Sequence, residues 1–281
     1  MDPMDLPIPI PAKPDVMVLS KRIVIDKIYR IVGSSYIKGF WIFDPTTGLT
    51  VPDRGPLGHN LTLGSDASLL SPGVAGYCPN LTMAGTAATS WSVADSNDFS
   101  FGNGAGVDSA FTLVALVNPN ADDFTLNRII VGKGAAAAYE YWIQFYGNGF
   151  GAVCINNAGT AYVGRSTAAI YALDAGSWHT YAVTFSGGSP QANAGCNLYR
   201  DGVDVDSADY TVVGYAGMTG GTASLESYVG GLQYSKAKYG VVIIISKELT
   251  STEVGEVNTL LQSYVGTGIP PMDLLLLEDD V

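Results

Sequence analysis

The stretch that decides the fold runs from residue 111 to residue 119 and reads FTLVALVNP. Residues 111–117 are apolar at nearly every position, which is typical of a strand buried on both faces. Asn118-Pro119 then ends the strand, because proline has no backbone N–H to donate to a sheet. The segment therefore predicts a central strand in a layered β structure.

The segments that follow repeat a pattern of short strands and polar turns. Strands are predicted in RIIVGKG (128–134), YEYWIQFYG (139–147), GAVCIN (151–156) and WHTYAVTF (178–185). In the last of these, Tyr181, Val183 and Phe185 alternate with smaller residues, so one face is expected in the core. Short strands separated by Gly, Asn and Asp turns are typical of a β-sandwich or barrel.

A tight hairpin is predicted in NLYRDGVDVDSA, residues 197–208. Asp201-Gly202 separates two alternating runs, and a two-residue turn of this type needs positive φ at both central positions. Aspartate and glycine are among the residues that accept such angles.

One helix is predicted near the C-terminus, and Thr250 and Glu253, which have the spacing of a capping box, mark its start. Residues 251–263 place an apolar stripe at helical spacing, and Gly266 is expected to end the helix. We expect the helix to pack on the edge of the sandwich. The stripe consists of Val254, Val257, Leu261 and Val265.

The chain divides by charge into three parts: residues 1–38 carry +2, residues 39–265 carry −10 and residues 266–281 carry −4. The first part is expected to be a Pro-rich extended N-terminal arm, because prolines at 3, 7, 9, 11 and 14 favour polyproline conformation. Val16 to Val32 is rich in β-branched residues and is predicted to be strand-like, although a helical period also fits. The arm either packs on its own domain or reaches a neighbouring subunit.

Composition excludes several classes of protein. The 281 residues carry a net charge of −12, which repels a phosphate backbone and argues against nucleic acid as a partner. The longest apolar runs are far shorter than a membrane span, and the N-terminus lacks the pattern of a standard secretory signal. Cys78, Cys154 and Cys196 are expected to be buried thiols, since their number and spacing fit neither a disulfide framework nor a metal site.

Several spaced motifs resemble the laminin G-like, concanavalin A-like lectin family, in particular its bacterial and phage branch. They are the aromatic-rich opening at 39–64, the approach to the core strand at 96–119, the Trp-His strand, the Asp-Gly hairpin, TASLESYVGGL (222–232) and KYGVVIIISKELTSTEV (238–254). The resemblance covers residues 39–265. It implies an all-β fold, an antiparallel two-sheet jelly-roll sandwich, here with one short C-terminal helix and the extended N-terminal arm.

The chain departs from the family pattern at two places. Thr180 stands where a second histidine is usual, and Val241-Val242 stand where the closing strand usually has an acidic pair. Functions that depend on those acids are not expected. A glycosidase pair is also missing, because only Asp204 and Asp206 share the spacing of two carboxylates on one strand face, and solvent exposure explains them as well. We expect no enzyme activity.

Calcium is the cofactor that the resemblance implies, because laminin G-like relatives often bind it at loop aspartates. Clusters of Asp and Asn oxygens suit hard cations, but they also form ordinary Asx turns. The candidate ligands are Asp95, Asn97 and Asp98 in one loop, and Asp201 and Asp204 at the hairpin.

Carbohydrate binding is expected by analogy with lectins of this fold, in which an exposed aromatic ring stacks on a sugar. The alternative for each aromatic residue is packing against its own sheet. The candidates are Trp91, Tyr162, Tyr171, Tyr210 and Tyr215.

These features lead to two hypotheses of function. The first is a non-enzymatic virion structural protein, a capsid decoration or tail or fibre component, displayed on the particle surface. Residues 1–38 would then join neighbouring virion subunits, including further copies of this chain. The alternative is a carbohydrate-binding adhesion module that attaches to surface glycans, located outside the cell without a standard signal peptide. Residues 266–281 are expected to be an acidic C-terminal tail.

Overall fold

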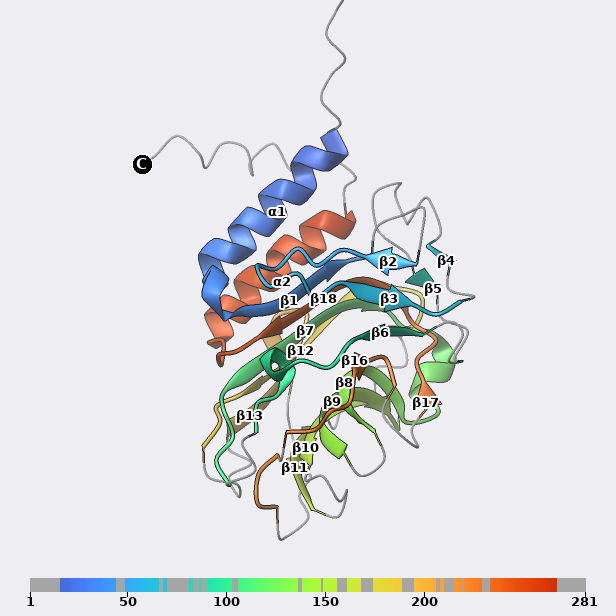
Figure 1. Cartoon of the computed structure of the whole chain (residues 1–281). Coiled ribbons are helices and arrows are strands. Elements are labelled where there is room, and N and C mark those ends of the chain that lie inside the picture. Colours follow the sequence, from blue (N-terminus) through green and yellow to red (C-terminus); the bar gives the residue numbers. More distant parts are fainter. Residues whose placement is uncertain are drawn as a thin grey trace, which may run out of the picture.

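The protein folds as three layers: a pair of helices, a first sheet and a second sheet (Figure 1). The structure is a computed structural model. It describes residues 16–43, 49–65, 68–69, 81–82, 86, 90–102, 106–135, 138–147, 149–155, 161–167, 174–188, 195–205, 208–209, 215–218, 220–228 and 233–266.

The first sheet has the order β14-β13-β12-β7-β18-β5-β4, with β1 also pairing with β18. The central strand β7 lies between β12 and β18, as expected for a strand that is mainly apolar on both faces. Its bounds and those of the other strands of this sheet are β1 Ile37–Ile42, β4 Ser68–Leu69, β5 Leu81–Thr82, β7 Phe111–Asn118, β12 His179–Phe185, β13 Cys196–Arg200, β14 Val203–Asp204 and β18 Lys238–Ile245.

The second sheet has the order β15-β11-β10-β9-β8-β16-β6-β3-β2. All of these strands pair antiparallel, and β17 joins β8 in parallel. The strands are β2 Thr50–Val51, β3 Leu61–Leu63, β6 Trp91–Val93, β8 Arg128–Ala135, β9 Ala138–Tyr146, β10 Gly149–Ile155, β11 Tyr162–Ser166, β15 Ala208–Asp209, β16 Leu225–Glu226 and β17 Gln233–Tyr234. Among the described residues, the short 3₁₀ turns Asn97–Phe99 and Ala121–Phe124 connect strands, and Ser34–Tyr36 connects α1 (Val16–Val32) to β1.

The main core lies between the two sheets and is rich in aromatic rings. Phe111 stacks on Phe101 with ring centroids 4.6 Å apart, and Tyr181 meets Phe145 edge to face at 5.1 Å. Side chains on the other face of β7, such as Val114 and Leu116, enter a second core beneath the helices. The prediction that β7 is buried on both faces, and with it the two-sheet sandwich, is confirmed.

The prediction for Val16 to Val32 is wrong, because this segment is the helix α1 (Val16–Val32) and not a strand of an extended arm. Val24, Ile28 and Val32 recur every four residues and are at most 5% exposed, packed on the first sheet and on α2 (Ser251–Gly266). This apolar stripe outweighs the weak preference of β-branched residues for strands. From residue 22 onward the segment therefore packs on its own domain, whereas residues 1–15 lie outside the described part.

The C-terminal helix confirms the capping box but not the expected position. The Thr250 Oγ1 accepts from the Glu253 amide at 3.2 Å, and a Glu253 carboxylate oxygen accepts from the Thr250 amide at 2.8 Å. Val254, Val257 and Leu261 are buried as predicted. However, α2 lies beside α1 across the outer surface of the first sheet, because both helices share the second core (Figure 1).

Two local predictions are also confirmed. The hairpin turn has φ of 51° at Asp201 and 77° at Gly202, as a two-residue turn with two positive φ angles requires. Cys154 and Cys196 are buried free thiols, whereas Cys78 lies outside the described residues.

Candidate functional site

The strand β9 presents two different faces. Tyr141, Ile143 and Phe145 point into the core between the sheets. The alternate residues Trp142, Gln144 and Tyr146 lie on the outer face of the second sheet, since successive side chains of a strand point to opposite sides. Both described α-helices cover the first sheet, and neither covers the outer face of the second sheet (Figure 1).

The register of β9, β10 and β11 places glycines among these outer side chains. Gln144 pairs with Gly151 and Gly151 with Ser166, so the middle position of this row has no side chain. The ring of Tyr146 fills part of that space, because a Cβ built on Gly151 would lie 3.1 Å from it. The same Cβ would lie 2.8 Å from the Arg165 carbonyl oxygen, so a larger residue at 151 would disturb the backbone of β11 as well as the tyrosine.

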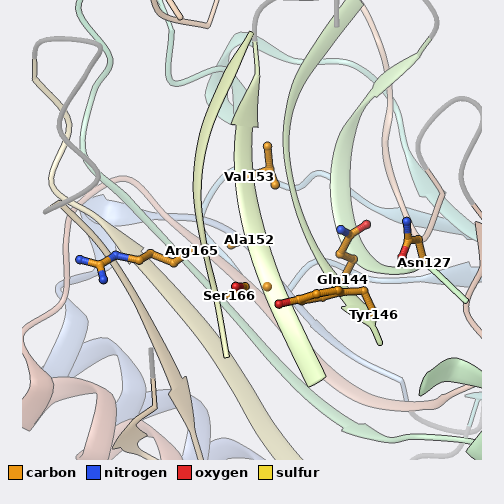
Figure 2. Close-up of a pocket in the computed structure, with 8 residues that line it drawn as sticks. Asn127, Gln144, Tyr146, Ala152, Val153, Arg165 and Ser166 are labelled. Carbon is orange, nitrogen blue, oxygen red and sulfur yellow. The ribbon is translucent and has the colours of Figure 1, made fainter. Parts of the chain in front are cut away.

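An open hollow with a cavity volume of about 40 Å³ lies at this point of the sheet. In Figure 2 the Tyr146 ring extends toward Ser166 beside Gln144, and the Arg165 side chain points away from them. This volume is far below the ~300–1,000 Å³ of sites that enclose a small ligand, so a ligand would lie across the hollow and place one group in it. Its lining residues are Asn127, Gln144, Tyr146, Gly151, Ala152, Val153, Arg165 and Ser166.

A small apolar cluster supports the hollow from the side. Ile129, Trp142 and Val153 pack together on the outer face, and Tyr139 and Tyr162 cover them in part. The rings of Tyr139 and Trp142 meet edge to face with centroids 6.2 Å apart. These contacts hold β8, β9, β10 and β11 in fixed positions beneath the polar groups.

Within the described part of the chain, two buried polar atoms on this face have no hydrogen-bond partner: the Gln144 Oε1 and the Trp142 Nε1. Gln144 is 8% exposed and Trp142 is 9% exposed. A buried polar group without a partner costs about 1–3 kcal/mol, and native proteins retain few of them. Gln144 also lines the hollow, so a ligand there would meet an acceptor that folding has left unpaired.

Two other hollows differ in this respect. One lies near Asn197, Glu248 and Ser251, and the other lies near Asn118 and Lys238. Among the described lining residues of these two hollows, no buried side-chain atom is left without a partner. The site on β8, β9, β10 and β11 is thus the better candidate, and we call it the β9 site.

The structure separates the aromatic residues expected to bind sugar. Trp91 is fully buried between the sheets against Phe43 and Tyr239, so the expectation that it is exposed is wrong. Tyr215 is 2% exposed and its hydroxyl donates to Asp108. Both side chains are large rings that bury their apolar area in the main core.

Tyr162 is the one predicted aromatic residue that lies on the outer face of the second sheet, half-buried at the start of β11. It contacts the apolar cluster beside the β9 site. Tyr171 and Tyr210 lie outside the described residues.

The first group of expected calcium ligands is divided among different partners. The Asp95 Oδ1 lies 2.9 Å from the buried Lys133 Nζ, so an internal ammonium occupies its coordination space. Asp98 instead binds the His59 Nε2 at 2.8 Å, and this hydrogen bond lowers the Asp98 pKa despite partial burial. Asn97 is exposed at the start of a 3₁₀ turn.

The second expected group is built into the hairpin. Asp201 Oδ2 lies 2.7 Å from His179 Nδ1 and 3.2 Å from Arg200 Nη1. Burial opposes ionisation of Asp201, but the hydrogen bonds from His179 and from the Thr180 amide outweigh it and lower the pKa. Asp204 lies exposed on the short strand β14.

In the described part of the chain, no group of three or more His, Cys, Asp or Glu residues is placed to hold a metal ion. Calcium binding stays a prediction. No helix among the described residues combines the length and apolar character of a membrane span.

Sequence reasoning missed Trp142, Gln144 and Tyr146 as site residues. It treated YEYWIQFYG only as a strand. One face of this strand carries apolar core residues, and the other face carries aromatic and polar residues. A polar glutamine between two aromatic residues on the non-core face was the available signal. The glycines that face it across the sheet could be recognised only once the register was known.

Residues 86–255 match the concanavalin A-like lectin/glucanases superfamily, which is more than half of the chain. The chain belongs to this superfamily. The resemblance expected from the spaced motifs is therefore confirmed. Among curated proteins, none matches the sequence.

Several solved structures share the fold of this superfamily member. The binding domain of Paraclostridial Mosquitocidal Protein 1 is 13% identical, with a TM-score of 0.57 over 82% of this chain and 53% of the other. The binding domain of botulinum neurotoxin DC in complex with rat synaptotagmin II is 10% identical, with a TM-score of 0.59 over 82% and 52%. The ligand binding domain of botulinum neurotoxin serotype D in complex with N-acetylneuraminic acid is 10% identical, with a TM-score of 0.55 over 84% and 52%.

This chain spans about half the length of those domains, and identity this low shows the fold alone.

Proposed function

We propose that this chain is a non-catalytic carbohydrate-binding domain and that its ligand occupies the β9 site. The observation that carries the proposal is the Gln144 Oε1, a buried acceptor without a partner among the described residues, at an open hollow on the outer face of the second sheet. A sugar hydroxyl donates readily to such an acceptor. The domain bears an unsatisfied group because a ligand satisfies it.

Each lining side chain has a defined part in this proposal. The Tyr146 ring, packed above Gly151, offers an aromatic surface for the C–H face of a sugar. Gln144 accepts a hydroxyl hydrogen at the floor of the hollow, and Asn127 and Ser166 provide polar groups at its rim. The combination of one ring and a few polar groups is typical of small-ligand sites.

The comparisons support binding more than catalysis. The similar solved structures are binding domains, one of them in complex with N-acetylneuraminic acid and another with rat synaptotagmin II. The location on a virion surface stays a prediction. Packing of α1 on its own domain removes one reason for it, since residues 22–32 make their contacts within the chain.

A printed glycan array tests the proposal, followed by calorimetry with the strongest array ligand. Gln144→Leu removes the unpaired acceptor at similar volume, so we expect binding to fall at least tenfold while the free energy of unfolding stays equal or rises by up to ~1 kcal/mol. Tyr146→Ala is expected to weaken binding by a similar factor through loss of the aromatic surface.

The matched control is Gln262→Leu on α2. Gln262 donates to Asp201 Oδ1 at 3.1 Å, so this substitution should cost stability by about 1 kcal/mol and leave glycan binding unchanged. Absence of any array signal, or full binding by both Gln144→Leu and Tyr146→Ala, would refute the proposal.

A further inference from the structure

A second set of side chains lies on the same outer surface, beyond the β9 site. On β16, Leu225 is buried toward the core and Glu226 points to the outer side. Glu226 pairs in register with Gly132 of β8, and Gly132 pairs with Trp142 of β9. Glu226 and Trp142 are thus two strands apart on one face, about 10 Å between Cα atoms from the usual strand spacing.

An aromatic pair stands beside Glu226. The rings of Tyr228 and Tyr234 are stacked with centroids 4.2 Å apart and an interplanar angle of 15°. Tyr234 pairs with Ile129 of β8, and Ile129 pairs with Gln144. The stack is therefore also two strands from the β9 site, on the same side of β8 as Glu226.

The Glu226 carboxylate is unusual because it is half-buried and lacks a partner. Within the described part of the chain it accepts no hydrogen bond and forms no ion pair, and burial alone raises its pKa to about 7. Proteins pair most buried carboxylates, so an unpaired, half-buried one with a shifted pKa is a candidate functional group.

The groups that face this carboxylate carry no positive charge. Tyr234 and Tyr228 are phenols, and the register partners of Glu226 are Ser92 on β6 and Gly132 on β8. The adjacent cation on β8, Lys133, is fully buried and bound to Asp95 and Glu140. The carboxylate is thus left for a ligand.

We propose that Glu226, Tyr228 and Tyr234 form a second subsite, so that the ligand is an oligosaccharide that extends across β8 from the β9 site. This inference rests on the proposed sugar-binding function. The ionised carboxylate accepts two hydroxyl hydrogens from one sugar residue, and the stacked tyrosines contact its C–H groups. A span of about 10 Å exceeds one sugar ring, so binding requires at least a disaccharide.

The pH profile of binding provides the test, with the strongest array ligand supplied as monosaccharide, disaccharide and tetrasaccharide. Because the ionised form binds, Kd for the longer ligands should rise about tenfold from pH 8 to pH 6, as the ionised fraction falls. Glu226→Gln should make this profile flat. Tyr234→Ala should reduce the gain in affinity from monosaccharide to tetrasaccharide.

The matched control is Glu248→Gln, because burial also raises the pKa of Glu248, which lies before α2 near the other sheet. This variant should keep the pH profile of the unmodified protein. Profiles that are flat in the unmodified protein, or unchanged in Glu226→Gln, would overturn the second subsite while leaving the Gln144 and Tyr146 results intact. Full binding by Gln144→Leu and Tyr146→Ala would instead remove the first site, and the second would fall with it.

Discussion

Lys133 is the cation whose removal should cost the most stability. Its Nζ lies 2.5 Å from Glu140 Oε1, 2.9 Å from Asp95 Oδ1 and 2.7 Å from the Gly221 carbonyl oxygen. The Lys133 and Glu140 side chains are both fully buried. Removing one partner of a buried ion pair leaves an uncompensated charge and costs about 3–5 kcal/mol. Lys133→Met, which preserves the length of the side chain, should lower the free energy of unfolding by this amount.

The assay is urea unfolding followed by tryptophan fluorescence, with thermal unfolding as a second measure. Lys133→Met/Glu140→Gln removes both charges, so it should recover about 1–3 kcal/mol relative to the single variant. Lys247→Met is the exposed control: Lys247 Nζ lies 2.7 Å from Glu253 Oε1, but both side chains are about a quarter exposed, so the cost should stay below ~1 kcal/mol. A loss below ~1 kcal/mol in Lys133→Met, or no recovery in the double variant, would refute the reasoning.

Two further substitutions probe the helices and the hairpin. Ile28→Ala removes a fully buried side chain of α1 and should lower the free energy of unfolding in urea by about 2–4 kcal/mol. Arg22→Ala, at an exposed position of the same helix, should change it by less than ~0.5 kcal/mol. Equal effects of the two substitutions would place α1 away from the sheet. Gly202→Ala should cost about 1–2 kcal/mol, because φ is 77° there and the added Cβ would lie 3.1 Å from the Gly255 Cα of α2; an unchanged melting temperature would show that the turn relaxes freely.

The strands and their turns could be predicted because their signals are local. The apolar run of β7, the positive φ demanded at Asp201-Gly202 and the reciprocal bonds of Thr250 and Glu253 each depend on a few neighbouring residues. The segment that became α1 has no such signal. Its β-branched composition favours a strand, and only the presence of α2 and the first sheet decides in favour of the helical stripe of Val24, Ile28 and Val32.

The site residues were harder to predict because exposure and pairing are set by distant parts of the chain. Trp91 is covered by Phe43 and Tyr239, which lie far from it in sequence. Asp95 is bound by Lys133, which reads in sequence as one polar residue of a buried strand. Gln144 reads as an ordinary strand residue until the register places it beside Gly151.

The layer order itself limits where a ligand can bind. A two-sheet sandwich has two broad outer faces, and α1 and α2 occupy that of the first sheet with a continuous apolar core that includes Val241. Val241 therefore serves packing at a position where the family pattern usually has an acid. The outer face of the second sheet differs, since its apolar contacts are confined to a small cluster while the Gln144 Oε1 and the Glu226 carboxylate stay unpaired. One face thus contributes to stability and the other retains groups that cost stability, which is the division expected when only the second sheet meets a ligand.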